Sequence, residues 1–210
     1  MTQESKIPNP TIKRLIYYSR PLETLLETGP PIISSEKLAG LCGVNPAQVR
    51  KDLAYFGEFG VRGVGYDVRN LLSQIKGILA SDRVWRLCIV GMGNLGNSLV
   101  EHENFKKRGY IFVAIFDSDD EKIGMRLPCG LKIEPNTKIG ELVRKLNIQI
   151  GVISTPPKEA QRMTGLLCDA GVHAILNFAP IQVRAPKSCI VENVDFSMKF
   201  EDLAYHLEKL

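Results

Sequence analysis

Residues 88–96 read CIVGMGNLG, and this stretch decides the fold of the larger part of the chain. The apolar segment Trp85–Val90 runs into a G-x-G-x-x-G pattern, which stands where a helical segment begins. In such a unit the first glycine permits a tight turn, the second lets the backbone approach a pyrophosphate, and the third lets the helix pack on the strand. The helix N-terminus favours the phosphate charge. The expected dinucleotide contacts are Gly91, Met92, Gly93, Asn94, Leu95 and Gly96.

The next apolar segment, residues 111–116, leads directly into Asp117. A carboxylate at this place can accept hydrogen bonds from both hydroxyls of an adenine ribose and would repel a 2′-phosphate, so NAD(H) is favoured over NADP(H). Asp117 lies 26 residues after Gly91, slightly further than the usual ~20. The alternative, that Asp117 only caps a turn in the sequence DSDDEK, stays open.

Strand-like and helix-like segments alternate beyond this point, which predicts an α/β fold with a Rossmann-type parallel sheet. We expect strands at residues 111–116, 148–153, 174–178 and 189–194, and helices at residues 95–107, 139–146 and 158–170.

The turns after two of these strands read STPP (residues 154–157) and NFAP (residues 177–180). Ligands bind beyond the carboxyl ends of parallel strands, so Thr155 and Asn177 are candidates to bond a carboxamide, and the prolines to pack on a nicotinamide ring. Ordinary strand-to-helix turns explain these residues equally well. The expected cofactor contacts outside the glycine loop are Asp117, Lys122, Thr155, Pro156, Asn177 and Ala179.

Residues 1–80 have a different pattern. Helices are predicted at residues 11–28, 35–42, 45–56 and 70–79, the first kinked or split by Pro21, which has no N–H. Asn45 can cap the third helix, with Pro46 in its first position and Gln48 completing a capping box. The second and third helices, joined across residues 43–45, have helix-turn-helix geometry.

The third helix carries polar side chains off its apolar face, of types that contact base edges and phosphates in a major groove. Residues 57–68, GEFGVRGVGYDV, follow as a predicted β-hairpin, which would be the wing of a winged helix and carry Arg62 toward a minor groove. The alternative is a small helical domain with a solvated basic face. The expected DNA contacts are Gln48, Arg50, Lys51, Tyr55 and Arg62.

The composition of the chain excludes several classes of protein. The chain has 210 residues, 44% hydrophobic and 24% charged, so disordered and fibrous classes are excluded. A net charge of +4 is too small to indicate a nucleic-acid partner, although residues 1–80 hold 10 basic and 7 acidic residues. Five scattered cysteines without a CxxC pair argue against disulfides and zinc and favour the cytoplasm. No apolar run approaches the roughly 20 residues of a membrane helix, and no secretion signal is expected.

The sequence offers few candidates for a catalytic residue. A dehydrogenase needs a proton donor or acceptor beside the hydride, and of the three histidines only His102 lies near the glycine loop in sequence. There is no Tyr-x-x-x-Lys pair. An NAD-dependent oxidoreductase with a helical extension, and a dinucleotide- or coenzyme-A-binding module of a larger assembly, remain alternatives to a DNA-binding protein.

The chain resembles the Rex family of bacterial redox-sensing transcriptional repressors. The matching stretches are KIPNPTIKRLIYY, NPAQVRKDLAYFGEFGVRGVGY, IVGMGNLG, FDSDDEKIG, ISTPPKEAQ, ILNFAP and NVDF, in the family's order. The resemblance implies a homodimer without catalytic activity or small-molecule substrate that binds palindromic operator DNA with NAD+ or no cofactor and is released by NADH. The implied domains are residues 1–80 (winged helix), 81–195 (Rossmann) and 196–210 (a dimerisation helix exchanged between subunits).

The resemblance also implies a switch. Asp195 would distinguish the charged from the neutral nicotinamide, and with NADH it would pair with Arg14 of the first helix instead. Many family members have a tyrosine near the nicotinamide where this chain has His102, in the sequence VEHENF. Because an imidazole titrates near neutral pH, a pH-dependent response to NADH is expected.

Overall fold

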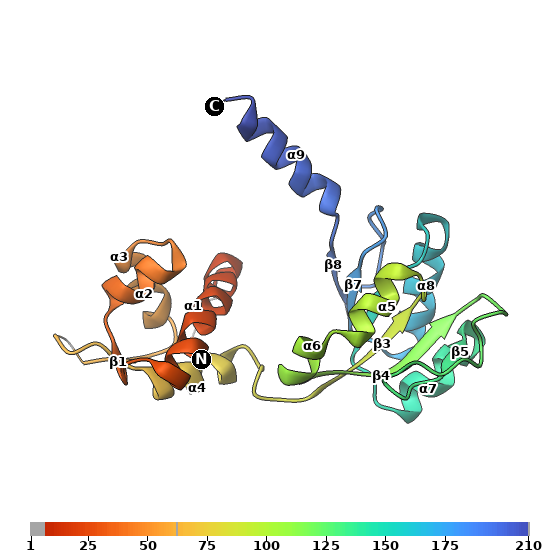
Figure 1. Cartoon of the computed structure of the whole chain (residues 1–210), viewed down its shortest axis with the longest axis horizontal. Helices are drawn as coiled ribbons and strands as arrows, with labels where there is room; N and C mark the ends of the chain where they lie inside the picture. Colours follow the sequence, from red (N-terminus) through yellow and green to blue (C-terminus); the bar gives the residue numbers. More distant parts are fainter. Residues whose placement is uncertain (1–6, 62, 210) are drawn as a thin grey trace. The chain divides into compact units, whose positions relative to one another are not determined.

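A computed structural model describes residues 7–61 and 63–209. The chain divides into two compact units, Met1–Arg83 and Val84–Leu210, each of which has its own core (Figure 1).

The first unit is helical, with a small two-stranded sheet at its side. Its helices are α1 (Asn9–Thr28), α2 (Ser35–Cys42), α3 (Pro46–Ala54) and α4 (Val68–Ile78). Strands β1 (Ile32–Ile33) and β2 (Tyr66–Asp67) pair in antiparallel fashion. Each helix turns apolar side chains inward, and the fully buried ones include Leu15, Tyr18, Leu22, Leu38, Val49, Leu71 and Ile75.

Helix α1 passes through Pro21 as one helix and is not split. Proline has no N–H, so the carbonyl of Tyr17, four residues earlier, loses its usual helical donor. The Cys42 thiol of α2 donates to that carbonyl, with Sγ and O 3.6 Å apart. A neighbouring helix thus supplies the bond that Pro21 removes, and the contact joins α1 to α2.

The start and end of α3 differ from two expectations. The Asn45 side chain caps the helix by accepting from the Ala47 N–H at 2.8 Å, as predicted. Gln48 does not complete a capping box, because its side chain donates to the Asp52 carboxylate instead. The helix ends at Ala54, two residues before the predicted end.

Among the described residues, the predicted hairpin of residues 57–68 is present as a short antiparallel bridge between Val61 and Gly65. The last residues of the segment form β2 and pair with β1, which was not predicted. Gly65 has φ +110°, and a Cβ there would lie 2.6 Å from the Ile33 carbonyl oxygen. Arg62, at the expected tip, lies outside the described residues.

The second unit contains a parallel sheet, and its described strands run in the order β5-β4-β3-β6-β7-β8. From β3 the chain adds β4 and β5 on one side and then returns to add β6, β7 and β8 on the other. The direction of strand addition therefore reverses at β3, and such a reversal opens a crevice at the carboxyl ends. The strands are β3 (Trp85–Val90), β4 (Tyr110–Asp117), β5 (Ile133–Pro135), β6 (Ile150–Ile153), β7 (Ala174–Asn177) and β8 (Ile190–Asn193).

Separate apolar clusters cover the two faces of this sheet. One packs α7 (Ile139–Lys145) and α8 (Pro157–Ala170) against strand residues such as Val90, and the other involves α5 (Asn94–Glu101) and Ile89. The predicted α/β class with a Rossmann-type sheet is confirmed. Two details were missed: the three-residue strand β5, and a break at His102 that separates α5 from α6 (Glu103–Lys107).

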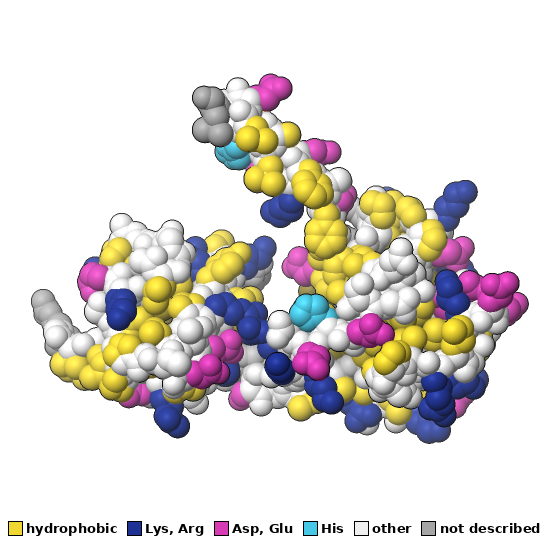
Figure 2. All heavy atoms as spheres, in the orientation of Figure 1, with side chains coloured by type: hydrophobic (Ala, Val, Ile, Leu, Met, Phe, Trp, Pro, Cys, Tyr) yellow, Lys and Arg dark blue, Asp and Glu magenta, His cyan; other side chains and the backbone are white. Residues whose placement is uncertain are grey.

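Helix α9 (Phe196–Leu207) has no buried residue. Hydrophobic side chains lie along it in the space-filling view (Figure 2). The largest exposed ones are Phe196, Met198, Phe200, Leu203, Tyr205 and Leu207. Among the described helices none has the length and hydropathy needed to span a membrane.

Candidate functional site

A cavity of about 520 Å³ lies at the carboxyl ends of the central strands. The glycine loop contributes Gly91, Met92 and Gly93, and the turn after β6 contributes Ser154–Pro157. Of the residues predicted from sequence, the cavity brings together Gly91, Met92, Gly93, Asp117, Lys122, Thr155 and Pro156.

The three glycines have separable roles. Gly91 has φ +99°, and a Cβ on it would lie 2.8 Å from the Ser154 carbonyl oxygen. A Cβ on Gly96 would collide with the Gly91 carbonyl oxygen. A Cβ on Gly93 would meet no described atom within 4 Å. Gly91 and Gly96 are thus required by the fold, whereas Gly93 leaves open space at the N-terminus of α5, where Asn94 and Leu95 are exposed.

Asp117 holds the glycine loop against the end of β4. Its carboxylate accepts from the backbone N–H of Met92 at 2.6 Å, Ser118 at 2.7 Å and Asp119 at 2.9 Å. The capping role left open above is therefore present. A carboxylate has about four acceptor positions, so three of those on Asp117 are occupied, and its expected contact with the ribose hydroxyls stays a prediction. Lys122 Nζ lies 3.9 Å from Asp117 and 3.2 Å from Asp119.

Two polar atoms of the cavity-lining residues are buried without a hydrogen-bond partner among the described residues. They are Thr155 Oγ1 and Asn136 Oδ1. A buried polar atom left unsatisfied costs about 1–3 kcal/mol, so a polar ligand that satisfies these atoms would be favoured here. Asn136 was not predicted, because it follows the short strand β5 that the sequence pattern did not reveal.

Asn177 does not fit its expected role. Its side-chain nitrogen donates to the carbonyls of Ala179 and Ile181 and to the Asn193 side chain, and its oxygen accepts from the Ala179 N–H. The residue is fully buried. Because this amide is occupied in joining the ends of β7 and β8, it is not available to a carboxamide. Ala179 is also buried, and neither residue lines the cavity.

The three residues expected to form the switch have different local surroundings. His102 lines another cavity, of about 550 Å³, where its ring centroid is 5.3 Å from that of Phe105. Asp195 caps α9 by accepting from the Ser197 N–H at 2.9 Å and hydroxyl at 2.7 Å, which lower the pKa of its carboxyl. Arg14, in the first unit, binds Asp52 through its guanidinium.

Asp52, on α3, is a fully buried carboxylate with a complete set of donors. Arg14 binds it through Nε at 2.6 Å and Nη2 at 2.7 Å, and Thr11, Tyr18 and Gln48 donate at 3.1, 2.7 and 2.9 Å. Burial alone would raise the pKa of Asp52, but the bonds from Arg14, Tyr18 and Gln48 outweigh it and lower that pKa to about 2. The hydrogen bond to Asp52 in turn raises the pKa of Arg14.

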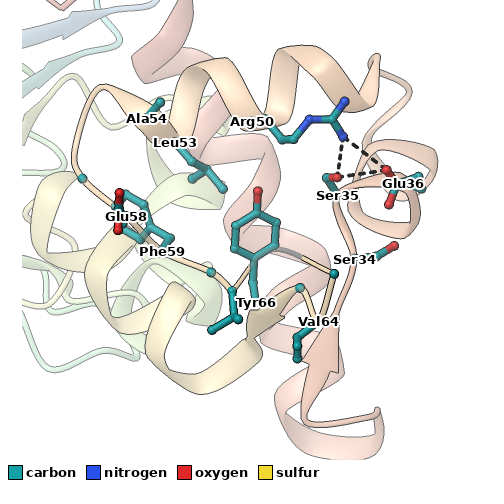
Figure 3. A pocket seen from close by; sticks show the side chains of 15 residues that line it. Ser34, Ser35, Glu36, Arg50, Leu53, Ala54, Glu58, Phe59, Val64 and Tyr66 are labelled. Atoms are coloured by element: carbon teal, nitrogen blue, oxygen red, sulfur yellow. Dashed lines mark hydrogen bonds and ion pairs between the residues drawn. The ribbon is translucent and has the colours of Figure 1, made fainter.

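The expected DNA-reading side chains of α3 are mostly accessible. Lys51 and Tyr55 are exposed, and Gln48 is half-buried. Arg50 donates through Nη1 to the Ser35 hydroxyl at 2.8 Å and to Glu36 Oε1 at 3.2 Å. Figure 3 shows Arg50 turned toward these α2 residues at the edge of a cavity of about 730 Å³, which extends to the turn before β2.

Known proteins resemble both units. Residues 6–54 match a family model described as "Putative DNA-binding protein N-terminus", and residues 82–181 match one described as "CoA binding domain". A redox-sensing transcriptional repressor Rex from Syntrophobacter fumaroxidans is 54% identical over 97% of both chains. Another from Solidesulfovibrio magneticus is 48% identical over 96% of this chain and 91% of that one.

Solved structures match nearly the whole chain as well. The crystal structure of RSP in complex with β-NAD+ and operator DNA has a TM-score of 0.93 at 33% identity, covering 98% of this chain and 94% of that one. The structure of RSP in complex with β-NADH has a TM-score of 0.87 at 31% identity, covering 98% and 96%.

Proposed function

The chain belongs to the Rex family of redox-sensing transcriptional repressors, and from that premise we propose that it senses the ratio of NADH to NAD+. As a cytoplasmic homodimer it binds palindromic operator DNA when it holds NAD+ or no cofactor, and NADH releases it. The observation that carries the proposal is the combination, on one chain, of a dinucleotide cavity with two unsatisfied polar atoms and a helix-turn-helix with exposed basic side chains.

The residues of the cavity fit NAD(H). The N-terminus of α5 and the open space at Gly93 suit the pyrophosphate. Asp117 can take one ribose hydroxyl, Thr155 and Asn136 offer buried polar atoms, and Pro156 offers an apolar surface. When bound, the cofactor supplies a nicotinamide that carries one positive charge in its oxidised form and none in its reduced form.

The proposed protein is a sensor and catalyses no reaction. The oxidoreductase alternative needs a proton donor near the nicotinamide, and its one candidate, His102, does not line the dinucleotide cavity. Other members of the family are named as repressors. Because His102 lies outside the dinucleotide cavity, nothing in the second unit supports the expected pH-dependent response to NADH through this residue.

The switch needs one revision. Asp195 and Arg14 are retained as its members, but Arg14 already binds a buried carboxylate through two hydrogen bonds. Pairing with Asp195 must therefore compete with Asp52. Because Asp52 belongs to α3, release of Arg14 would alter the support of the DNA-reading helix itself.

An operator-release assay tests the function. The protein is incubated with a palindromic promoter fragment and NAD+ at a stated salt concentration, since phosphate contacts make affinity salt-dependent, and NADH is then added. We expect a gel shift that micromolar NADH abolishes. An equal addition of NAD+ controls for nucleotide and ionic effects. Absence of specific DNA binding, or binding that ignores NADH, would contradict the proposal.

A further inference from the structure

Asp52 makes five hydrogen bonds, and in every one of them it is the acceptor. The donors are side chains of two helices: Thr11, Arg14 and Tyr18 of α1, and Gln48 of α3 itself. The cluster is buried where α1 meets α3. It links the DNA-reading helix to α1, and the proposed function treats Asp52 only as the group that competes for Arg14.

The charge of Asp52 determines which way the Gln48 amide faces. An ionised carboxylate can only accept hydrogen bonds, so the amide must turn its NH2 group inward, with Nε2 2.9 Å from Asp52 Oδ1. The carbonyl oxygen Oε1 then lies on the other branch of the amide. No described residue donates a hydrogen bond to it. Gln48 thus retains one free acceptor and one free N–H.

The position of Gln48 suits base reading. It is the third residue of α3, and first-turn residues of a helix-turn-helix recognition helix contact base edges in the major groove. Its side chain is half-buried, so part of it reaches the surface.

The free acceptor and N–H of the Gln48 amide together match the major-groove edge of adenine and not that of guanine. Adenine presents the N6 amino donor and the N7 acceptor in the major groove, whereas guanine presents two acceptors, O6 and N7. A glutamine free to flip could offer either end to other groups. One held by a carboxylate is fixed in the adenine-reading orientation.

We propose that Asp52 is a positioning residue for DNA specificity, which orients the Gln48 amide so that each subunit reads an adenine in its half-site. This inference rests on the proposed function, because it assumes that α3 enters a major groove. It assigns Arg14, Thr11 and Tyr18 the task of holding Asp52 in place, and it adds a base preference at one position of α3.

Selection from random duplex DNA in the presence of NAD+ tests the inference without a known operator. Wild-type protein should select palindromes with one A·T pair per half-site that depends on Gln48. We expect Gln48→Ala to lose the preference for that pair alone, by about 5- to 100-fold relative to other bases. Gln48→Glu replaces the amide donor by a carboxylate that Asp52 repels, so it should also lose the adenine preference. Gln74→Ala, on an exposed face of α4, is the matched control and should leave the profile unchanged.

Asp52→Asn tests the positioning role, with thermal melting recorded alongside. A folded variant should lose the adenine preference although Gln48 is intact; retained preference would overturn the role of Asp52. If this variant does not fold, the two Gln48 variants decide the inference. Sequence-specific wild-type binding that Gln48→Ala leaves unchanged at every position would overturn it. Failure of wild-type protein to select any sequence would instead overturn the proposed function.

Discussion

At the scale of single residues, the buried pair of Asp52 and Arg14 makes the first unit sensitive to one substitution. Asp52→Ala would leave the Arg14 guanidinium and the Tyr18 hydroxyl without their acceptor. Removing one partner of a buried ion pair typically costs about 3–5 kcal/mol, so we expect a clear loss of thermal stability by circular dichroism. Asp82→Ala, an exposed carboxylate with a neighbouring arginine at 3.9 Å, should melt like wild type. Equal melting of both variants would contradict the prediction.

The Asp52 carboxylate also predicts that the first unit loses stability at acid pH. The folded pKa of Asp52, about 2, is below its ordinary value of 3.8, so the unfolded chain takes up a proton first as the pH falls. The stabilisation, about 2 kcal/mol, is therefore complete above pH 4 and is lost as the pH falls toward 2. Unfolding followed between pH 5 and 2 should show this decline, and Asp52→Ala should lack that component of it.

The glycines of the loop can be separated by mutation. Gly96→Ala should destabilise the second unit by about 1–3 kcal/mol, because its Cβ has no room beside the Gly91 carbonyl. Gly93→Ala should cost less than about 1 kcal/mol, since its Cβ points into open space at a helix cap. We expect NADH affinity, measured by calorimetry, to fall about tenfold or more in Gly93→Ala, equivalent to 1.4 kcal/mol. Unchanged affinity would place the pyrophosphate elsewhere.

At the scale of elements, α9 presents exposed apolar side chains, of which Phe196 lies against the Phe178 ring with centroids 6.2 Å apart. Burying a phenylalanine or leucine stabilises an interface by about 1.5–3 kcal/mol each. The double substitution of Phe200→Ser with Leu203→Ser should therefore convert a dimer to monomers in analytical ultracentrifugation. Glu201→Ser with Asp202→Ser, on the same helix, should remain dimeric. A monomeric wild type would contradict the homodimer.

The elements were predictable where the signals are local. Asn45 and Pro46 mark the start of α3, and the glycine loop marks the turn between β3 and α5, because caps and turns depend on adjacent residues. The break at His102 carries no proline or glycine, and β5 is only three residues long, so neither has a sequence signature.

Long-range contacts were the part of the site that sequence could not provide. Thr11 and Asp52 are 41 residues apart, and Asn177 and Asn193 are 16 apart. Asn177 carries the right chemistry for a ligand, but the return of β8 beside β7 occupies it. Arg14 matches its family motif, but α3 brings a carboxylate to it. In both cases packing determined which partner the side chain binds.

At the scale of the whole molecule, the modest net charge of +4 means that a few cations must account for the salt dependence of DNA binding. Lys51 is exposed and forms no ion pair with any described residue. A lysine that contacts one phosphate contributes about 1 to the slope of log affinity against log salt. A dimer has two copies of Lys51, so we expect Lys51→Ala to lower the slope of log affinity against log salt by about 2. DNA binding would be measured by fluorescence anisotropy at salt concentrations from about 50 to 300 mM, which bracket ~100 mM. An unchanged slope would remove Lys51 from the interface.

The amide of Asn177 has a mechanical consequence for α9. It binds the Asn193 side chain, and the Asn177 carbonyl accepts from the Val194 N–H at 2.8 Å, so the chain is fastened to the sheet until two residues before α9 begins. A helix attached so closely can pivot about that point but cannot slide. Twelve residues form a rod about 18 Å long. A rotation of roughly 10° about that point would move the far end of the helix by about 3 Å, so a small change at the ends of β7 and β8 would produce a larger displacement there.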